Sequence, residues 1–174
     1  MTSRSVRSTP GRYGTVLIWV CLMAFSSVTH ADETMVLTET IKEYSPGTSI
    51  TYYEDTTGQL TINDILAGKP PISFQPSLVD TPNFGFTESS FWFSIEVHNA
   101  AAHESHWIMA VDYPLLDVID VYEIENGKKS REYHTGDDLL FYSRPIDHPT
   151  FIFPLELKPN QTLKLLIHIE STGA

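Results

Sequence analysis

Cysteine and basic residues are scarce in this 174-residue chain. The one cysteine, Cys21, lies in an apolar N-terminal run, so the remainder has no disulfide, thiolate nucleophile or cysteine-based metal site. Lysine and arginine number 11 against 22 acidic residues, which gives a formal net charge of −11. A surface this acidic repels phosphate groups, and this argues against nucleic acid as a partner.

Several sequence patterns of catalytic sites are also missing. The chain has no Gly-x-Ser-x-Gly nucleophile elbow and no glycine-rich phosphate loop. His98, His103 and His106 cluster near Glu104, but the second histidine of His-Glu-Ser-His comes one residue too early for a zinc-protease helix. We interpret them as surface histidines and predict no metal, no cofactor and no enzymatic activity. A small glycan-processing enzyme with two catalytic carboxylates stays an alternative, but 22 acidic residues make such pairs frequent by chance.

The first 31 residues have the pattern of an export signal. Three arginines within residues 1–12 precede an apolar run at 15–28, and the small Thr29 and Ala31 suit a cleavage site. We predict a signal peptide at 1–31 and one periplasmic domain at 32–174; an uncleaved N-terminal anchor is the alternative. Removing the three arginines leaves 8 basic against 22 acidic residues, a formal charge of −14.

Short segments with alternating apolar and polar residues dominate the rest of the chain. Alternation of this kind is typical of strands with one buried face. It predicts an all-β fold, an antiparallel jelly-roll β-sandwich of about eight strands with one short helix. The expected strands are Met35 to Glu39, Ser49 to Glu54, Ser89 to Asn99, His106 to Val111, Asp117 to Ile124, Ser130 to His134, Thr150 to Leu157 and Thr162 to Glu170.

The helix is expected from Thr61 to Ala67. Thr61 and Asp64 stand in capping-box positions, and Gly68 suits a left-handed end. Residues 72–88 then read as an irregular connection, which three phenylalanines are expected to pin to the core: Phe74, Phe84 and Phe86.

The strand from Ser89 to Asn99 has two different faces. One carries the core stripe Phe91, Phe93, Ile95 and Val97, and the other alternates Trp92 with polar side chains. That second face either lies under another layer, with Trp92 packed beneath residues 72–88, or it binds a ligand. The ligand-binding residues that we predict are Trp92, Ser94, Glu96, His98, Tyr122, Arg144 and His168. Trp92 would be a stacking platform, Glu96 and His98 would form hydrogen bonds, and Arg144 would line the rim or form an ion pair.

The order of motifs resembles a known family. The motifs are Tyr53-Glu54-Asp55, Gly58-Gln59-Leu60-Thr61-Ile62, Ser90-Phe91-Trp92-Phe93 with Asn99, Tyr113-Pro114-Leu115-Leu116-Asp117-Val118-Ile119-Asp120-Val121-Tyr122, Thr135-Gly136-Asp137, Arg144-Pro145, Phe151-Ile152-Phe153-Pro154-Leu155 and the closing Leu-x-Leu-Leu-Ile-x-Ile-Glu-Ser strand. Together they look like the type-two extracellular domain of bacterial seven-transmembrane receptors with diverse intracellular signalling modules (7TMR-DISM). The similarity covers about residues 35 to 173.

This resemblance implies a periplasmic, non-catalytic jelly-roll sensor that is similar to carbohydrate-binding modules. In the family, a seven-helix membrane region and a cytoplasmic output follow, often a diguanylate cyclase or histidine kinase. Trp92 matches the family tryptophan, whereas Ser94 stands where the family often has a basic residue. Further matches are Asp117, Gly136, Asp137, Arg144 and Pro145. The chain stops at Ala174 before any membrane helix, so a truncated receptor, a fragment and a free periplasmic form stay open.

The function that we predict is periplasmic sensing of a carbohydrate-like or other small polar ligand for signal transduction. The alternative is a protein–protein interaction module of the cell envelope that docks a partner membrane receptor.

Overall fold

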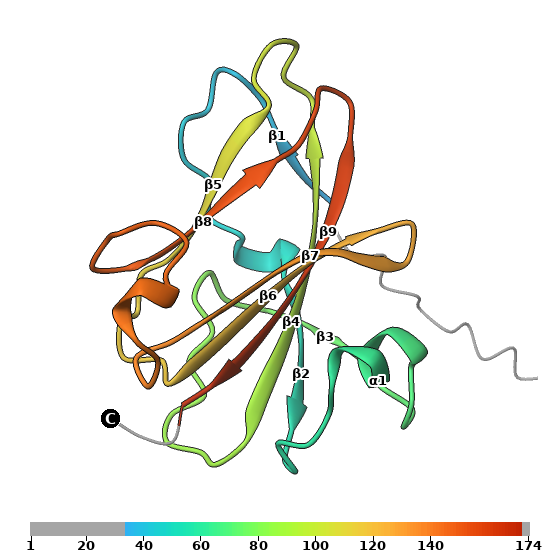
Figure 1. Ribbon diagram of the computed structural model, residues 1–174. Coiled ribbons are helices and arrows are strands. Elements are labelled where there is room, and N and C mark those ends of the chain that lie inside the picture. The colour runs from blue at the N-terminus through green and yellow to red at the C-terminus, as the bar shows by residue number, and fades with distance from the viewer. Residues whose placement is uncertain (1–33, 172–174) are drawn as a thin grey trace, which may run out of the picture.

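The computed structural model describes residues 34–171, so the predicted signal peptide and Cys21 lie outside the described residues. The described part is mostly β-structure with one α-helix and two short 3-10 turns (Figure 1). Its strands are β1 (Met35–Leu37), β2 (Thr51–Asp55), β3 (Gln75–Pro76), β4 (Ser90–Asn99), β5 (His106–Val111), β6 (Val118–Glu125), β7 (Lys128–Thr135), β8 (Phe151–Glu156) and β9 (Thr162–Glu170). The helix α1 spans Ile62–Ala67, and the 3-10 turns η1 and η2 span Gly47–Ser49 and Phe141–Ser143.

Two sheets make up the fold, which confirms the predicted all-β sandwich. The larger sheet has the order β3-β2-β4-β9-β6-β7, and β1 pairs with β4 in parallel. All other pairings are antiparallel, including the separate two-stranded sheet of β5 and β8 (Figure 1). The strand β4 is therefore interior to the sheet, between β2 and β9.

The main core lies between the two sheets. The predicted stripe of β4 and the inner residues of its neighbour β9 face the apolar side of β8, and Phe151, Phe153 and Leu163 are at most 1% exposed. Alternation along each strand produces this core, because every second side chain points toward the facing sheet.

A second, smaller core covers the outer face of the larger sheet. Ile62 and Ile65 of α1 pack with Trp92, Ile124 and Leu166 of the sheet. Ile72 and Phe74, from the segment after α1, contribute partly buried side chains to the same cluster. The outer face of the sheet is therefore covered at this end.

The local sequence signals around α1 are confirmed. The Thr61 side chain accepts a hydrogen bond from the Asp64 amide, the Asp64 carboxylate accepts one from the Thr61 amide, and Gly68 adopts a left-handed φ of 62°. Of the phenylalanines expected to pin the following connection, Phe84 stacks on Phe91 at 4.0 Å between ring centroids. The expectation for Phe86 is wrong, because this side chain is 87% exposed.

Candidate functional site

Five side chains form one continuous row across the outer face of the larger sheet. Tyr53, Trp92, His168, Asp120 and His134 come from β2, β4, β9, β6 and β7, and each lies directly opposite the next. Directly opposed residues bring their side chains within contact distance on one face of a sheet. The row therefore runs from the covered side of the face, near α1, to the edge strand β7.

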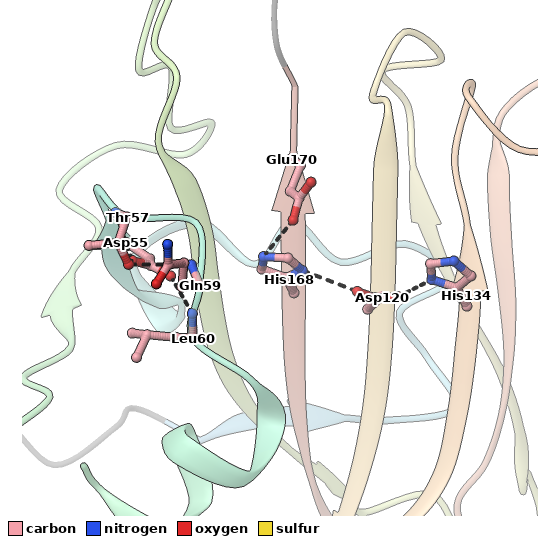
Figure 2. A network of polar contacts seen from close by, with 8 residues as sticks. All are labelled: Asp55, Thr57, Gln59, Leu60, Asp120, His134, His168 and Glu170. Atoms are coloured by element: carbon pink, nitrogen blue, oxygen red, sulfur yellow. Dashed lines mark hydrogen bonds and ion pairs between the residues drawn. The ribbon is translucent and has the colours of Figure 1, made fainter. Parts of the chain in front are cut away.

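Asp120 is the centre of the polar half of this row. Its Oδ2 lies 3.1 Å from His168 Nδ1, and its Oδ1 contacts His134 Nδ1. His168 Nε2 lies 3.6 Å from Glu170 Oε1, which extends the network toward the end of β9 (Figure 2). The His134 side chain is 61% exposed whereas those of Asp120 and His168 are 14% and 9% exposed, so the network reaches solvent at β7.

The two histidines stabilise the ionised form of Asp120. Burial raises the pKa of the Asp120 carboxyl, but hydrogen bonds and electrostatic attraction from His168 and His134 outweigh burial and lower the pKa below its ordinary value. Asp120 is therefore a carboxylate at neutral pH, held in place from two sides.

Trp92 occupies the apolar half of the row and is 1% exposed. Its ring stacks on His168 at 4.5 Å between centroids and lies 6.0 Å from the nearly parallel ring of Tyr122. Its Nε1 is buried and has no hydrogen-bond partner in the described part of the chain. The indole thus belongs to the second core, and a ligand would find no open ring face there to stack on.

Tyr122 and Ser94 lie close to Trp92 on the same face. Tyr122 is partly buried, and this burial, together with the charges of Asp120 and Glu132, raises the pKa of its hydroxyl to about 12. Ser94 is 1% exposed, and its hydroxyl has no hydrogen-bond partner among the residues that the structure describes. Of the seven predicted ligand-binding residues, the structure brings together Trp92, Ser94, Tyr122 and His168.

The other three predicted residues lie elsewhere. Glu96 accepts a hydrogen bond from Thr34, and His98 Nδ1 lies 2.9 Å from Thr162 Oγ1, both toward the opposite end of β4. Arg144 belongs to the connection between β7 and β8. Its guanidinium lies over the rings of Phe141 and Phe151, at 4.8 Å and 4.4 Å from their centroids, and donates to the carbonyls of His148 and Pro149.

Sequence reasoning does not place three members of the row, Tyr53, Asp120 and His134, among the ligand-binding residues. Sequence reasoning names Asp120 only as part of a family-like motif, but in the structure its carboxylate contacts His168 and His134. It does not single out His134 at all. The signal that could have found it is the Asn126-Gly127 turn, because a tight hairpin fixes which residues of its two strands face each other.

A second polar cluster shapes the chain before α1. Asp55, which is 3% exposed, accepts hydrogen bonds from the Thr57 amide and hydroxyl and from the Leu60 amide (Figure 2). Burial opposes ionisation of Asp55, but these bonds lower its pKa below the ordinary value. The Asp55 carboxylate thus holds the turn that precedes α1, and this turn places α1 against the outer face of the larger sheet.

Comparison with protein families identifies the domain. A family model described as 7TMR-DISM extracellular 2 matches residues 47–174. The chain belongs to this family. The match confirms the resemblance inferred from the motifs, and 7TMR-DISM extracellular domains are sensor domains of transmembrane receptors. A search of curated proteins found no match. Within residues 34–171, no helix of this 7TMR-DISM domain is long and apolar enough to cross a membrane.

Proposed function

We propose that this 7TMR-DISM extracellular domain senses a carbohydrate-like or other small polar ligand in the periplasm and is not a catalyst. Binding would favour one arrangement of the domain relative to the membrane part of its receptor, and this shift in population would be the signal. The proposal rests first on membership of a receptor sensor family.

The outer face at β6 and β7 is the proposed binding surface. It combines the partly buried ring of Tyr122 with the hydrogen-bonding groups of Asp120 and the exposed His134. A sugar presents apolar ring faces and hydroxyl groups together, so an aromatic ring beside fixed polar groups suits it. Trp92 would act from beneath, as the ring on which Tyr122 and His168 rest. Ser94, Glu96, His98 and Arg144 stay proposed contacts only for a ligand that extends beyond this surface.

The test is a titration of the purified protein with glucose, N-acetylglucosamine, maltose and cellobiose by calorimetry. Each saccharide is added to a final concentration of about 10 mM, at which binding with a millimolar dissociation constant is detectable. His134→Ala should weaken binding of the responding saccharide by about tenfold, because a hydrogen bond to a charged or polar partner is lost. Trp92→Ala is unsuitable, since truncating a buried tryptophan costs about 3–5 kcal/mol of stability.

His103→Ala is the matched control. His103 is exposed in the connection between β4 and β5, away from the proposed surface, so this variant should bind the saccharide with unchanged affinity. Failure of all four saccharides to bind would contradict the carbohydrate proposal, and equal affinity of wild type and His134→Ala would contradict the assigned surface.

Docking of a partner membrane receptor is a second candidate function. Leu140, Phe141 and Tyr142 are 64%, 53% and 81% exposed, and such an apolar group typically marks an interaction site. These residues lie near the end of β9, because the Asp138 amide bonds the Asp117 carbonyl and Val118 pairs with Glu170. Replacing Leu140 and Tyr142 by serine together should abolish co-purification with the receptor while leaving the melting temperature unchanged; retained co-purification would exclude this docking surface.

A further inference from the structure

A cleft of about 390 Å³ lies at the side of the sandwich where β6 and β7 meet the end of β8. Its volume falls within the range of small-molecule sites. Charged and polar side chains dominate its lining, among them Glu123, Glu125, Glu156, Arg131, Lys158 and Gln161. The lining has no aromatic residue apart from the imidazole of His106, and Leu157 is its one apolar side chain.

Glu123 occupies a position in this cleft that the strand pattern assigns to the core. Ile119 and Val121 precede it on the inner face of β6, and both are fully buried. Glu123 continues that stripe and is 4% exposed, opposite Leu165 of β9. A carboxylate in an apolar position costs stability, so its presence there calls for a physical reason.

The buried carboxylate is incompletely satisfied. Among residues 34–171, Glu123 Oε1 accepts no hydrogen bond, and the guanidinium of Arg131 lies 3.7 Å away, beyond hydrogen-bond distance. Arg131 also lies 3.4 Å from Glu156 Oε2, so two carboxylates share its charge. Burial raises the pKa of Glu123 above its ordinary value, and Arg131 only partly offsets this.

We propose that this cleft binds a small aliphatic ligand that carries an ammonium group, with Glu123 as the residue that accepts its N–H. Three carboxylates line the cleft against the two basic side chains of Arg131 and Lys158, and the chain as a whole carries a net charge of −11. An ammonium group would donate the hydrogen bond that Glu123 Oε1 lacks. Its positive charge would also balance the excess of carboxylates in the cleft. The absence of phenylalanine, tyrosine and tryptophan rings from the lining favours a flexible aliphatic molecule over a flat one.

This site is separate from the surface proposed for carbohydrate. Glu123 points to the inner face of β6 with Ile119 and Val121, whereas Asp120 and Tyr122 belong to the outer face. A substitution in one of the two sites can therefore be tested for its effect on binding without altering the side chains of the other site.

The experiment titrates the purified protein with 1,4-diaminobutane and with 1,4-butanediol, a neutral molecule of similar shape, at physiological salt. Binding is followed by calorimetry and by the backbone amide NMR signals of Glu123, Ser130 and Gln161. We expect the diamine to bind and to shift these signals, and the diol to do neither. Glu123→Gln keeps the shape of the side chain, and it should weaken diamine binding by about tenfold because the charge-assisted hydrogen bond is lost.

Glu43→Gln is the control for overall charge. Glu43 is exposed and outside the cleft, and its replacement changes the net charge by the same amount as Glu123→Gln. The control should bind the diamine like the wild type, and circular dichroism should show both variants folded. Equal weakening by the two variants, equal binding of diamine and diol, or absence of diamine binding at about 10 mM would each overturn the proposal.

Discussion

At the scale of single residues, contacts and burial decide which motif positions are structural. Gly136, one of the family-like positions, approaches the backbone of the chain before β6. A Cβ built at this glycine would lie 1.9 Å from the Asp117 carbonyl oxygen and 2.6 Å from its carbonyl carbon. Backbone atoms cannot move aside as a flexible side chain can, so the position accepts only glycine.

Gly136→Ala should therefore destabilise the domain by about 1–3 kcal/mol, or more if the two segments separate. Gly58→Ala is the control, since Gly58 has a φ of +61° but, apart from its two chain neighbours, no described residue has an atom within 4 Å of the place that its Cβ would take. Its free energy of unfolding should fall by only about 1 kcal/mol, the cost of an alanine with a left-handed φ. Chemical denaturation of both variants measures the difference, and equal losses would show that the close approach to Asp117 is unimportant.

At the scale of elements, the sequence predicts strands better than it predicts their neighbours. Period-2 alternation locates β5 and β9 at their observed bounds, and the Asn126-Gly127 turn locates the hairpin of β6 and β7. Alternation says which side chains share a face, but it does not say what covers that face. In the sequence, the apolar residues Ile62 and Ile65 are what indicates that α1 has a buried face, and in the structure this face covers Trp92.

Distance along a strand explains why the predicted ligand-binding residues do not form one site. Trp92 and His98 share one face of β4, but six residues of strand separate them by roughly 20 Å. Residues of neighbouring strands in one row, such as Trp92, His168 and Asp120, lie much closer together. Predicting the row requires the strand order, and strand order depends on long-range pairing that the local pattern does not contain.

The cap of α1 provides a test at this scale. Thr61→Ala removes the side chain that accepts from the Asp64 amide, and loss of such a cap costs about 1 kcal/mol. Because α1 holds Ile62 and Ile65 against Trp92, the variant should speed amide hydrogen exchange in α1 and lower the melting temperature by a few degrees. Thr48→Ala, at an exposed threonine outside α1, should change neither; unchanged exchange in Thr61→Ala would show that tertiary packing alone holds the helix.

At the scale of the whole molecule, buried carboxylates connect stability to pH. Asp120 and Asp55 both have a pKa below the ordinary value in the folded protein, through hydrogen bonds that outweigh burial. A carboxyl with a lower pKa when folded stabilises the fold at pH values above its unfolded pKa, near 4, and this contribution is lost as the pH falls through the folded pKa. Glu123 acts in the opposite direction, because its pKa is raised and its ionisation costs stability as the pH rises.

Asp120→Asn isolates the contribution of the histidine-bound carboxylate. At pH 7 the variant should be less stable than the wild type by about 1–3 kcal/mol, because His134 and His168 lose a charged acceptor. As the pH falls through the lowered pKa of folded Asp120, the wild-type carboxyl becomes protonated as well, so the two proteins should converge in stability. Urea denaturation at several pH values measures both limits. Asp147→Asn, at an exposed aspartate, should follow the wild type throughout, and a constant gap between wild type and Asp120→Asn at every pH would mean that shape rather than charge holds the row together.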